Sequence, residues 1–243
     1  HVIPVFFALY AYVSLFPKTK LHWVIKGIIF ALILISCQYP AFCRSFFAGY
    51  DAKVPHLGIV LYSWLFSAQL LLVLFAFAKD ILSVFCKMVL KKSLPHPTTT
   101  SVCVLALAAV LSAWGSYSAL CQPPLYNLEV PVKNLPKSLE GFRIIQLSDI
   151  HASPLLDRNR LVQVVERTNA LKPDLIVVTG DIVDGKTDAR ISDVAPLKEL
   201  KAPYGVFAVE GNHEHYVDYD GWMKTFPTLN LQVLHNSHRI LNV

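Results

Sequence analysis

Residues 142–151 read FRIIQLSDIH, a short apolar run that ends directly in the polar side chains of Asp149 and His151. Isoleucine and phenylalanine suit a pleated surface, and the run has the length of one buried strand. The same order of apolar run and polar end returns twice farther along the chain. The two further cases are Leu175–Val178 followed by Thr179-Gly180-Asp181, and Tyr204–Val209 followed by Glu210-Gly211-Asn212-His213-Glu214-His215. We interpret the three runs as strands that each end in a polar loop.

Helical patterns separate these strands. Asp157 can cap a helix whose apolar stripe ends before Pro173, and Ile191–Leu200 has the period of a second helix. A shorter helix over Tyr219–Phe226 leads to a fourth strand at Leu231–Leu234. Strands that alternate with helices predict an α/β layered domain. Because the carboxyl ends of the strands form the ligand crevice of such a sheet, we expect the three polar loops to converge.

The polar loops carry the ligands of a hard or borderline divalent cation, namely carboxylate oxygen, amide oxygen and imidazole nitrogen. Thiolates are absent from these loops, so Mn, Fe or Zn is the expected metal. The candidate ligands are Asp149, His151, Asp181 and Asn212. Positions two apart share a face of an extended strand end, so Asp149 and His151 are expected to chelate one ion. Asp181 has two oxygens with which to bridge two ions, and the glycines before Asp181 and Asn212 permit tight turns.

Two divalent ions about 3.5–4 Å apart would activate a water molecule and hold a tetrahedral phosphorus for in-line attack. His213 lies beside these ligands and is expected to protonate the leaving oxygen or to stabilise the charged transition state. Each motif alone is weak, because an Asp at a strand end is often a helix cap and Gly-Asn often forms a turn. Three such motifs, each after an apolar run, together predict a phosphoesterase site.

The three motifs resemble the first signature blocks of the calcineurin-like metallophosphoesterases. The stretch from Asn134-Leu135-Pro136 to His151 also resembles the bacterial membrane-associated branch of that family, and the resemblance covers residues 128–243. It implies an α/β sandwich flanked by helices, of which this chain carries the N-terminal half. It further implies that Asp149 and His151 bind one metal, that Asp181 bridges, and that Asn212 binds the second metal. His213 would be the catalytic histidine, and Glu214 would orient a neighbouring histidine.

The family supplies two further blocks downstream, a lone histidine and then a Gly-His-x-His pair, and neither occurs before Val243. We interpret His215, His235 and His238 as exposed polar residues instead. The chain therefore looks truncated at both ends, since it also opens at His1 inside an apolar run. With four ligands in place, we expect the chain as it stands to bind metal weakly and to turn over little.

The charge is divided unevenly along the chain. Residues 1–121 hold nine Lys or Arg, two Asp and no Glu, whereas residues 122–243 hold thirteen basic and fifteen acidic residues. The first half is a multi-pass α-helical membrane region with about four transmembrane helices, because its long apolar runs alternate with short basic loops. The expected spans are Val2–Phe16, Leu21–Cys37, Leu57–Ala78 and Ser101–Cys121. Lys26 can extend its amine to the headgroups.

The predicted organisation has three parts. Residues 1–121 form the membrane region, residues 122–141 a proline-containing linker with a possible edge strand near Leu128–Val132, and residues 142–243 the phosphoesterase part. Lysines before the second span and after the third place those loops in the cytoplasm, which puts the phosphoesterase part on the extracytoplasmic side of the cell (inner) membrane. The five cysteines all lie in the membrane region and read as apolar fillers.

The sequence as a whole predicts a membrane-anchored, metal-dependent phosphoesterase with two divalent ions. Its expected partners are the lipid bilayer and a phosphorylated small molecule or lipid-linked substrate, whose bond is a phosphomonoester, a phosphodiester or a pyrophosphate. A nucleic-acid partner is not indicated, because the basic loops flank membrane helices. The alternative is a non-catalytic membrane sensor or scaffold with a degenerate phosphoesterase-like domain.

Overall fold

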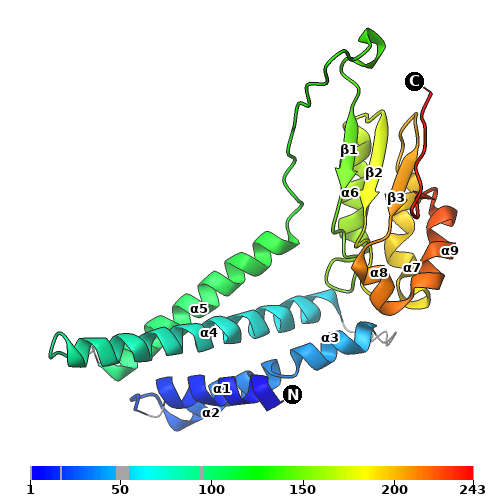
Figure 1. The fold of residues 1–243 in the computed structure, drawn as a ribbon. Coiled ribbons are helices and arrows are strands. Elements are labelled where there is room, and N and C mark those ends of the chain that lie inside the picture. Colours follow the sequence, from blue (N-terminus) through cyan, green and yellow to red (C-terminus); the bar gives the residue numbers. More distant parts are fainter. Residues whose placement is uncertain (1, 17, 48–54, 94–95, 243) are drawn as a thin grey trace. The chain divides into compact units, whose positions relative to one another are not determined.

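The computed structural model describes residues 2–16, 18–47, 55–93 and 96–242, so His1 and Val243, the ends of the predicted parts, lie outside it. The chain divides into two compact units. The first is helical and takes in residues 1–44 and 54–121, and the α/β part begins at Gln122 (Figure 1). Each unit is described here by itself.

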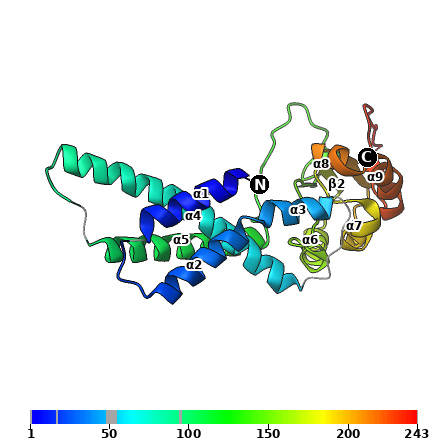
Figure 2. The same ribbon diagram turned by 90° about the horizontal axis from the view of Figure 1, so that it is seen from below.

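The helical unit has its described helices packed against α4 (Figure 2). Their bounds are α1 Val2–Leu15, α2 Trp23–Ser36, α3 Tyr39–Phe47, α4 His56–Met88 and α5 Pro97–Leu120. Three described stretches are long and apolar enough to cross a membrane, namely Trp23–Arg44, His56–Met88 and Pro97–Leu120. The first predicted span corresponds to α1, whose 14 residues reach only about 21 Å at ~1.5 Å per residue. By this measure three spans qualify among the described residues, not four.

Small side chains let the membrane helices approach closely. Ala8 and Ala11 of α1, Ala76 of α4 and Ala108 of α5 are buried in one cluster, as expected where helices pack by contact alone. The charged side chain of Asp80 is satisfied locally. Its carboxylate accepts from Tyr10 and Ser14 at 2.8 and 2.7 Å and pairs with Lys79 at 2.7 Å.

The α/β unit is a four-stranded parallel sheet in the order β1-β2-β3-β4, which confirms the predicted fold class. The strands are β1 Ile144–Leu147, β2 Leu175–Thr179, β3 Val206–Val209 and β4 Gln232–Val233. The connections are α6 Arg158–Ala170, then α7 Thr187–Val194 with η2 Ala195–Glu199, then α8 Asn212–Val217, α9 Tyr219–Thr225 and η3 Phe226–Leu229. Asp157 caps α6 as expected, since its carboxylate accepts from the Arg160 N–H.

One face of the sheet carries the helix-packed core, and the other is open only in part, since Leu175 and Phe207 on it are buried. Ile145 and Leu147 of β1, with Ile176 and Val178 of β2, contact the core that α6, α7 and α9 complete. On the other face, Ile144 of β1 is 57% exposed. A second sheet to cover this face, as a sandwich would have, is not among the described residues.

The linker before β1 contains the short helix η1 Lys137–Leu139 and is otherwise irregular. The edge strand considered for Leu128–Val132 is not formed in the structure: the segment has no strand pairing, and Leu128 is 85% exposed. A strand needs a neighbour for its backbone N–H and C=O groups, and none lies beside this segment in the described part of the chain.

Backbone hydrogen bonds join the loops that follow β1 and β2. The N–H of His151 donates to Asp181 O at 3.0 Å, and the N–H of Ala152 donates to Ile182 O at 2.9 Å. Glycine brings in the loop after β3. Gly180 has φ +77°, and a Cβ on it would lie 2.8 Å from Gly211 Cα. The loops after β2 and β3 can approach this closely only with glycine at both positions.

Gly180→Ala is therefore expected to lower the free energy of unfolding by about 1–3 kcal/mol more than Gly141→Ala. Gly141 has nearly the same φ, +79°, but an added Cβ there meets nothing within 4 Å, so it controls for backbone strain alone. Hydrogen exchange of the β2 and β3 amides measures the difference. Equal losses of protection in the two variants would contradict the close approach of the loops.

Candidate metal centre

The three polar loops converge at the carboxyl ends of β1, β2 and β3. Two groups of side chains there have ligand atoms that all lie within 4.8 Å of one another. The first group is Asp149, His151 and Asp181, and the second is His151, Asp184 and His213. His151 belongs to both, so the two groups form one continuous cluster of carboxylates and imidazoles.

Asn212, the predicted amide ligand, is placed by the contacts of its two neighbours in the chain. The His213 N–H donates to Asp181 Oδ1 at 3.0 Å. On the other side of Asn212, a Cβ built on Gly211 would collide with the same carboxylate oxygen. The residues before and after Asn212 therefore both contact Asp181, and the Asn212 side chain itself is exposed at the start of α8.

The backbone of the candidate ligands is unusual. Asp149, His151 and Asp181 have φ values of 54°, 46° and 50°, in the left-handed region. Such conformations cost of order 1–3 kcal/mol each in non-glycine residues and cluster at functional sites. The strand-alternation argument for Asp149 and His151 was wrong, because β1 ends at Leu147 and both residues lie in left-handed turns beyond it.

Glu214 joins two of the loops through hydrogen bonds to their main chain. Its side chain is fully buried. Oε1 accepts from the N–H groups of Ile182 and Val183 at 2.8 and 3.2 Å, and Oε2 from those of Asp181 and Gly211 at 3.2 and 2.7 Å. The family resemblance implied that Glu214 orients a histidine, whereas these four bonds hold the main chain of two loops.

Asp184 is the site residue that the sequence reasoning missed. Its Oδ1 lies 3.0 Å from His151 Nδ1 and 2.5 Å from His213 Nδ1. A carboxylate can only accept, so the Nδ1 atom of each ring carries a proton. The two rings meet edge to face with centroids 4.4 Å apart. A usable signal was present in the sequence: a carboxylate three residues after Asp181, directly beyond the apolar pair Ile182-Val183.

The remaining histidines lie outside both ligand groups among the described residues. His215 stacks on Tyr219 with centroids 4.4 Å apart, and His235 pairs with Glu210. Burial raises the pKa of Glu210, but hydrogen bonds from its own backbone N–H and from His235, with the charges of His235 and His215, lower the pKa on balance. His238 is exposed.

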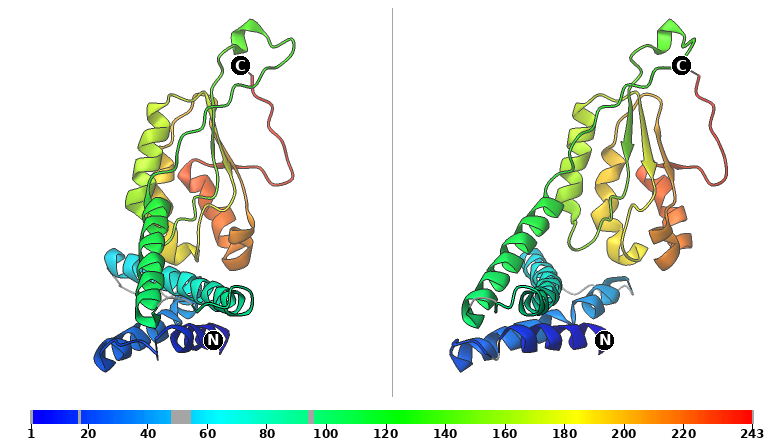
Figure 3. Two further views of the ribbon diagram at one scale, coloured as in Figure 1. Left: turned by 90° about the vertical axis from the view of Figure 1, so that its left-hand side faces the viewer. Right: turned by 60° about the vertical axis from the view of Figure 1, so that its left-hand side comes forward.

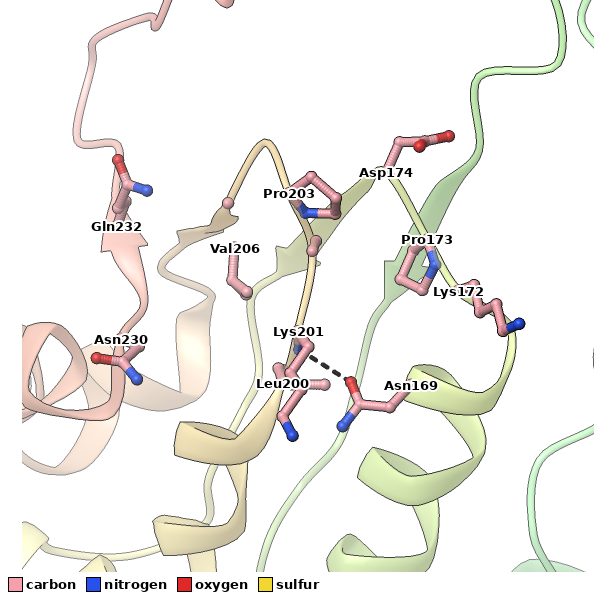
Figure 4. Close-up of a pocket in the computed structure, with 12 residues that line it drawn as sticks. Asn169, Lys172, Pro173, Asp174, Leu200, Lys201, Pro203, Val206, Asn230 and Gln232 are labelled. Carbon is pink, nitrogen blue, oxygen red and sulfur yellow. Dashed lines mark hydrogen bonds between the residues drawn. The ribbon is translucent and has the colours of Figure 1, made fainter.

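A wide hollow of about 780 Å³ lies at the opposite, amino-terminal edge of the sheet (Figure 4). Its amide side chains support chain turns. Asn169 accepts from the Lys201 N–H at 2.9 Å and donates to Glu199 O, while Asn230 donates to Lys198 O. The hollow is thus separate from the converging loops, and its polar groups are engaged in structure.

A parallel sheet whose strand ends gather carboxylates and imidazoles in this way defines a metal-binding α/β domain. Residues 142–242 match the family model described as calcineurin-like phosphoesterase, so this part of the chain is a calcineurin-like phosphoesterase domain. The resemblance drawn from the three motifs is confirmed.

Relatives that share the domain occur in animals and bacteria. The chain is 37% identical over 139 residues to the "Transmembrane protein with metallophosphoesterase domain" of Danio rerio, covering 57% of this chain and 32% of the relative. The Bos taurus protein of the same name is 38% identical over 133 residues, 54% of this chain and 30% of its own. An uncharacterized metallophosphoesterase of Helicobacter pylori is 34% identical over 122 residues, 50% and 32% respectively. The matches thus span about a third of each relative. No solved structure matches the chain significantly.

Glu214→Gln is expected to destabilise the α/β unit by at least about 2 kcal/mol and to weaken Mn²⁺ binding. The glutamine NH₂ cannot accept a hydrogen bond, so the backbone N–H groups that donate to that carboxylate oxygen in the native protein would lose their acceptor. Each unsatisfied buried donor costs about 1–3 kcal/mol. Thermal unfolding and Mn²⁺ titration by electron paramagnetic resonance measure the two effects.

Glu166→Gln on the exposed face of α6 is the matched control and should change neither quantity. Retention of wild-type stability by Glu214→Gln would show that the four backbone bonds do not hold the loops.

Proposed function

We propose that the protein is a membrane-anchored phosphoesterase that uses two divalent ions to hydrolyse a phosphomonoester, phosphodiester or pyrophosphate. The observation that carries the proposal is the shared Asp184 carboxylate, which holds His151 and His213 in one cluster with Asp149 and Asp181. The donor set fits Mn, Fe or Zn, because it combines carboxylate oxygens with imidazole nitrogen.

Each residue has a role in this proposal. Asp149 and His151 would hold one ion, Asn212 would hold the other, and Asp181 would contribute to both. The ions, when bound, supply an activated water and positive charge for the phosphoryl oxygens. His213 donates a proton from Nε2 to the leaving oxygen, since Asp184 fixes its Nδ1–H and stabilises the charged ring.

Membrane association is supported by three helices long and apolar enough to cross a bilayer and by relatives named transmembrane proteins. We further propose the cell (inner) membrane as the location and the extracytoplasmic side for the domain. Lys91 and Lys92 after α4, with Lys79 and Lys87 in the last part of α4, support this orientation, because positive charge beside a span stays in the cytoplasm. The substrate would then be a phosphorylated molecule of the membrane or envelope.

The second candidate function is a membrane sensor or scaffold whose phosphoesterase-like domain does not turn over. Activity of a protein with the complete domain separates the two candidates.

A protein with the complete domain is expected to hydrolyse bis(p-nitrophenyl) phosphate when loaded with Mn²⁺. His213→Ala should lower kcat by about 10²–10⁴-fold, because it removes the proton donor. His215→Ala, which alters a ring stacked on Tyr219, is the control and should retain activity.

The 243-residue chain should show weak Mn²⁺ binding and little turnover in the same assay. Turnover by this chain at the rate of the complete domain would contradict that expectation, and a complete domain inactive with Mn, Fe and Zn would favour the scaffold.

The orientation is tested with single cysteines in a chain whose five native cysteines are replaced by serine. A cysteine at Asp188 should react with a membrane-impermeant maleimide in intact cells, while one at Lys91 should react only after the membrane is broken. Both positions are exposed, so reactivity reports the side of the membrane. The reverse pattern would overturn the orientation.

A further inference from the structure

A groove of about 230 Å³ lies on the flank of the α/β unit. Three segments form its walls: the start of the linker at residues 122–125, β1 with the loop after it, and α6. Figure 3 shows the linker, in green, running beside α6, in yellow-green. All three segments belong to the second unit.

The groove is lined mainly by aliphatic side chains. Pro124 and Leu125 come from the linker, Ile145 and Leu147 from β1, and Val164 from α6. Leu125 is 45% exposed although it lies against these apolar neighbours. Binding of a hydrocarbon chain to an apolar concave surface of this kind is favourable, because it removes apolar area from water.

Polar contacts hold the linker in place over the groove. Gln122 Nε2 donates to Gln163 Oε1 at 3.0 Å, and Arg167 Nη1 donates to Pro123 O at 2.6 Å. Gln122 Oε1 is buried and has no hydrogen-bond partner within the described residues. A buried acceptor without a donor is costly to the folded state.

The groove adjoins the candidate metal centre. Its lining includes Ser148 and Asp149, and Asp149 is a candidate metal ligand. The linker wall begins at Gln122, which follows Leu120, the last residue of α5, after a single intervening residue. The covalent chain therefore separates the groove from a candidate membrane span by roughly 7 Å at most. Arg160 and Arg167 add positive charge to the same lining.

We propose that this groove binds the hydrocarbon chain of a phosphorylated amphiphile whose phosphate reaches Asp149 and His151. The proposal rests on the proposed function and names its substrate class. The occupant follows from three features together: an aliphatic lining, two arginines in that lining that complement a phosphate, and the presence of the candidate metal ligand Asp149 in the same lining. A soluble phosphate ester would make no use of the apolar lining.

The test uses the full 243-residue chain in lipid nanodiscs with millimolar Mn²⁺. The probe is dodecyl phosphate with a diazirine in its chain, and ethyl, butyl, hexyl and octyl phosphate compete with it. Photolabelling is expected in peptides that contain residues 122–125 and 156–164. The concentration of competitor that halves the labelling should fall about fourfold per added methylene, since each buried methylene contributes about 0.8 kcal/mol.

Leu125→Asp should reduce labelling at least tenfold and remove the dependence on chain length. Leu128→Asp is the matched control, since Leu128 lies on the same linker, is exposed and does not line the groove. Equal labelling of the two variants, or equal labelling by the neutral dodecanol analogue, would overturn the proposal.

A separate measurement distinguishes failure of the groove from failure of the proposed function. The ³¹P resonance of inorganic phosphate should be broader with the chain than with the same Mn²⁺ alone, and equally so for the native chain and both leucine variants. Broadening without any chain-length dependence would overturn the groove alone. Absence of broadening in the native chain would contradict the proposed metal site, and with it this inference.

Discussion

The buried carboxylate of Glu214 is the interaction on which the candidate site depends. A fully buried carboxylate is stable only when its lone pairs are satisfied, and here four backbone N–H groups from the loops after β2 and β3 do so. Asp181 and His213 lie on those same two loops. The backbone hydrogen bonds to Glu214 therefore position the two loops, and the loops position the polar side chains of the cluster.

Much of this arrangement could be predicted from the sequence. The apolar runs, the turn residues and the polar ends were sufficient for a parallel α/β sheet with converging loops, because strand length and burial depend on local hydrophobicity. The backbone at Asp149 and His151 could not be predicted, since its left-handed conformation depends on contacts such as His151 N–H to Asp181 O. Asp184 was missed for a related reason: its importance lies in two histidines from other loops.

Asp184 also links the two roles proposed for the histidines, metal binding and proton donation. One carboxylate oxygen accepts from the imidazole proposed to bind metal and from the imidazole proposed to donate a proton. The orientation of one ring is thereby linked to that of the other, and both Nε2 atoms are fixed together. A substrate phosphate between them would meet a ligand and a proton donor whose relative placement is settled before binding, which lowers the entropic cost of the reaction.

The parallel order of the sheet has a consequence for how the protein folds. Ile144 pairs with Leu175, and Ile176 pairs with Val206, so each strand must wait for a helix and a second strand before it gains a partner. Contacts between residues so distant in sequence form slowly, and no local hairpin can start the sheet. The helices before Cys121 leave the ribosome first, and each can form its backbone hydrogen bonds within itself. We expect the membrane helices to be inserted while β1 is still unpaired, which makes the interval before β2 emerges the step most exposed to misfolding.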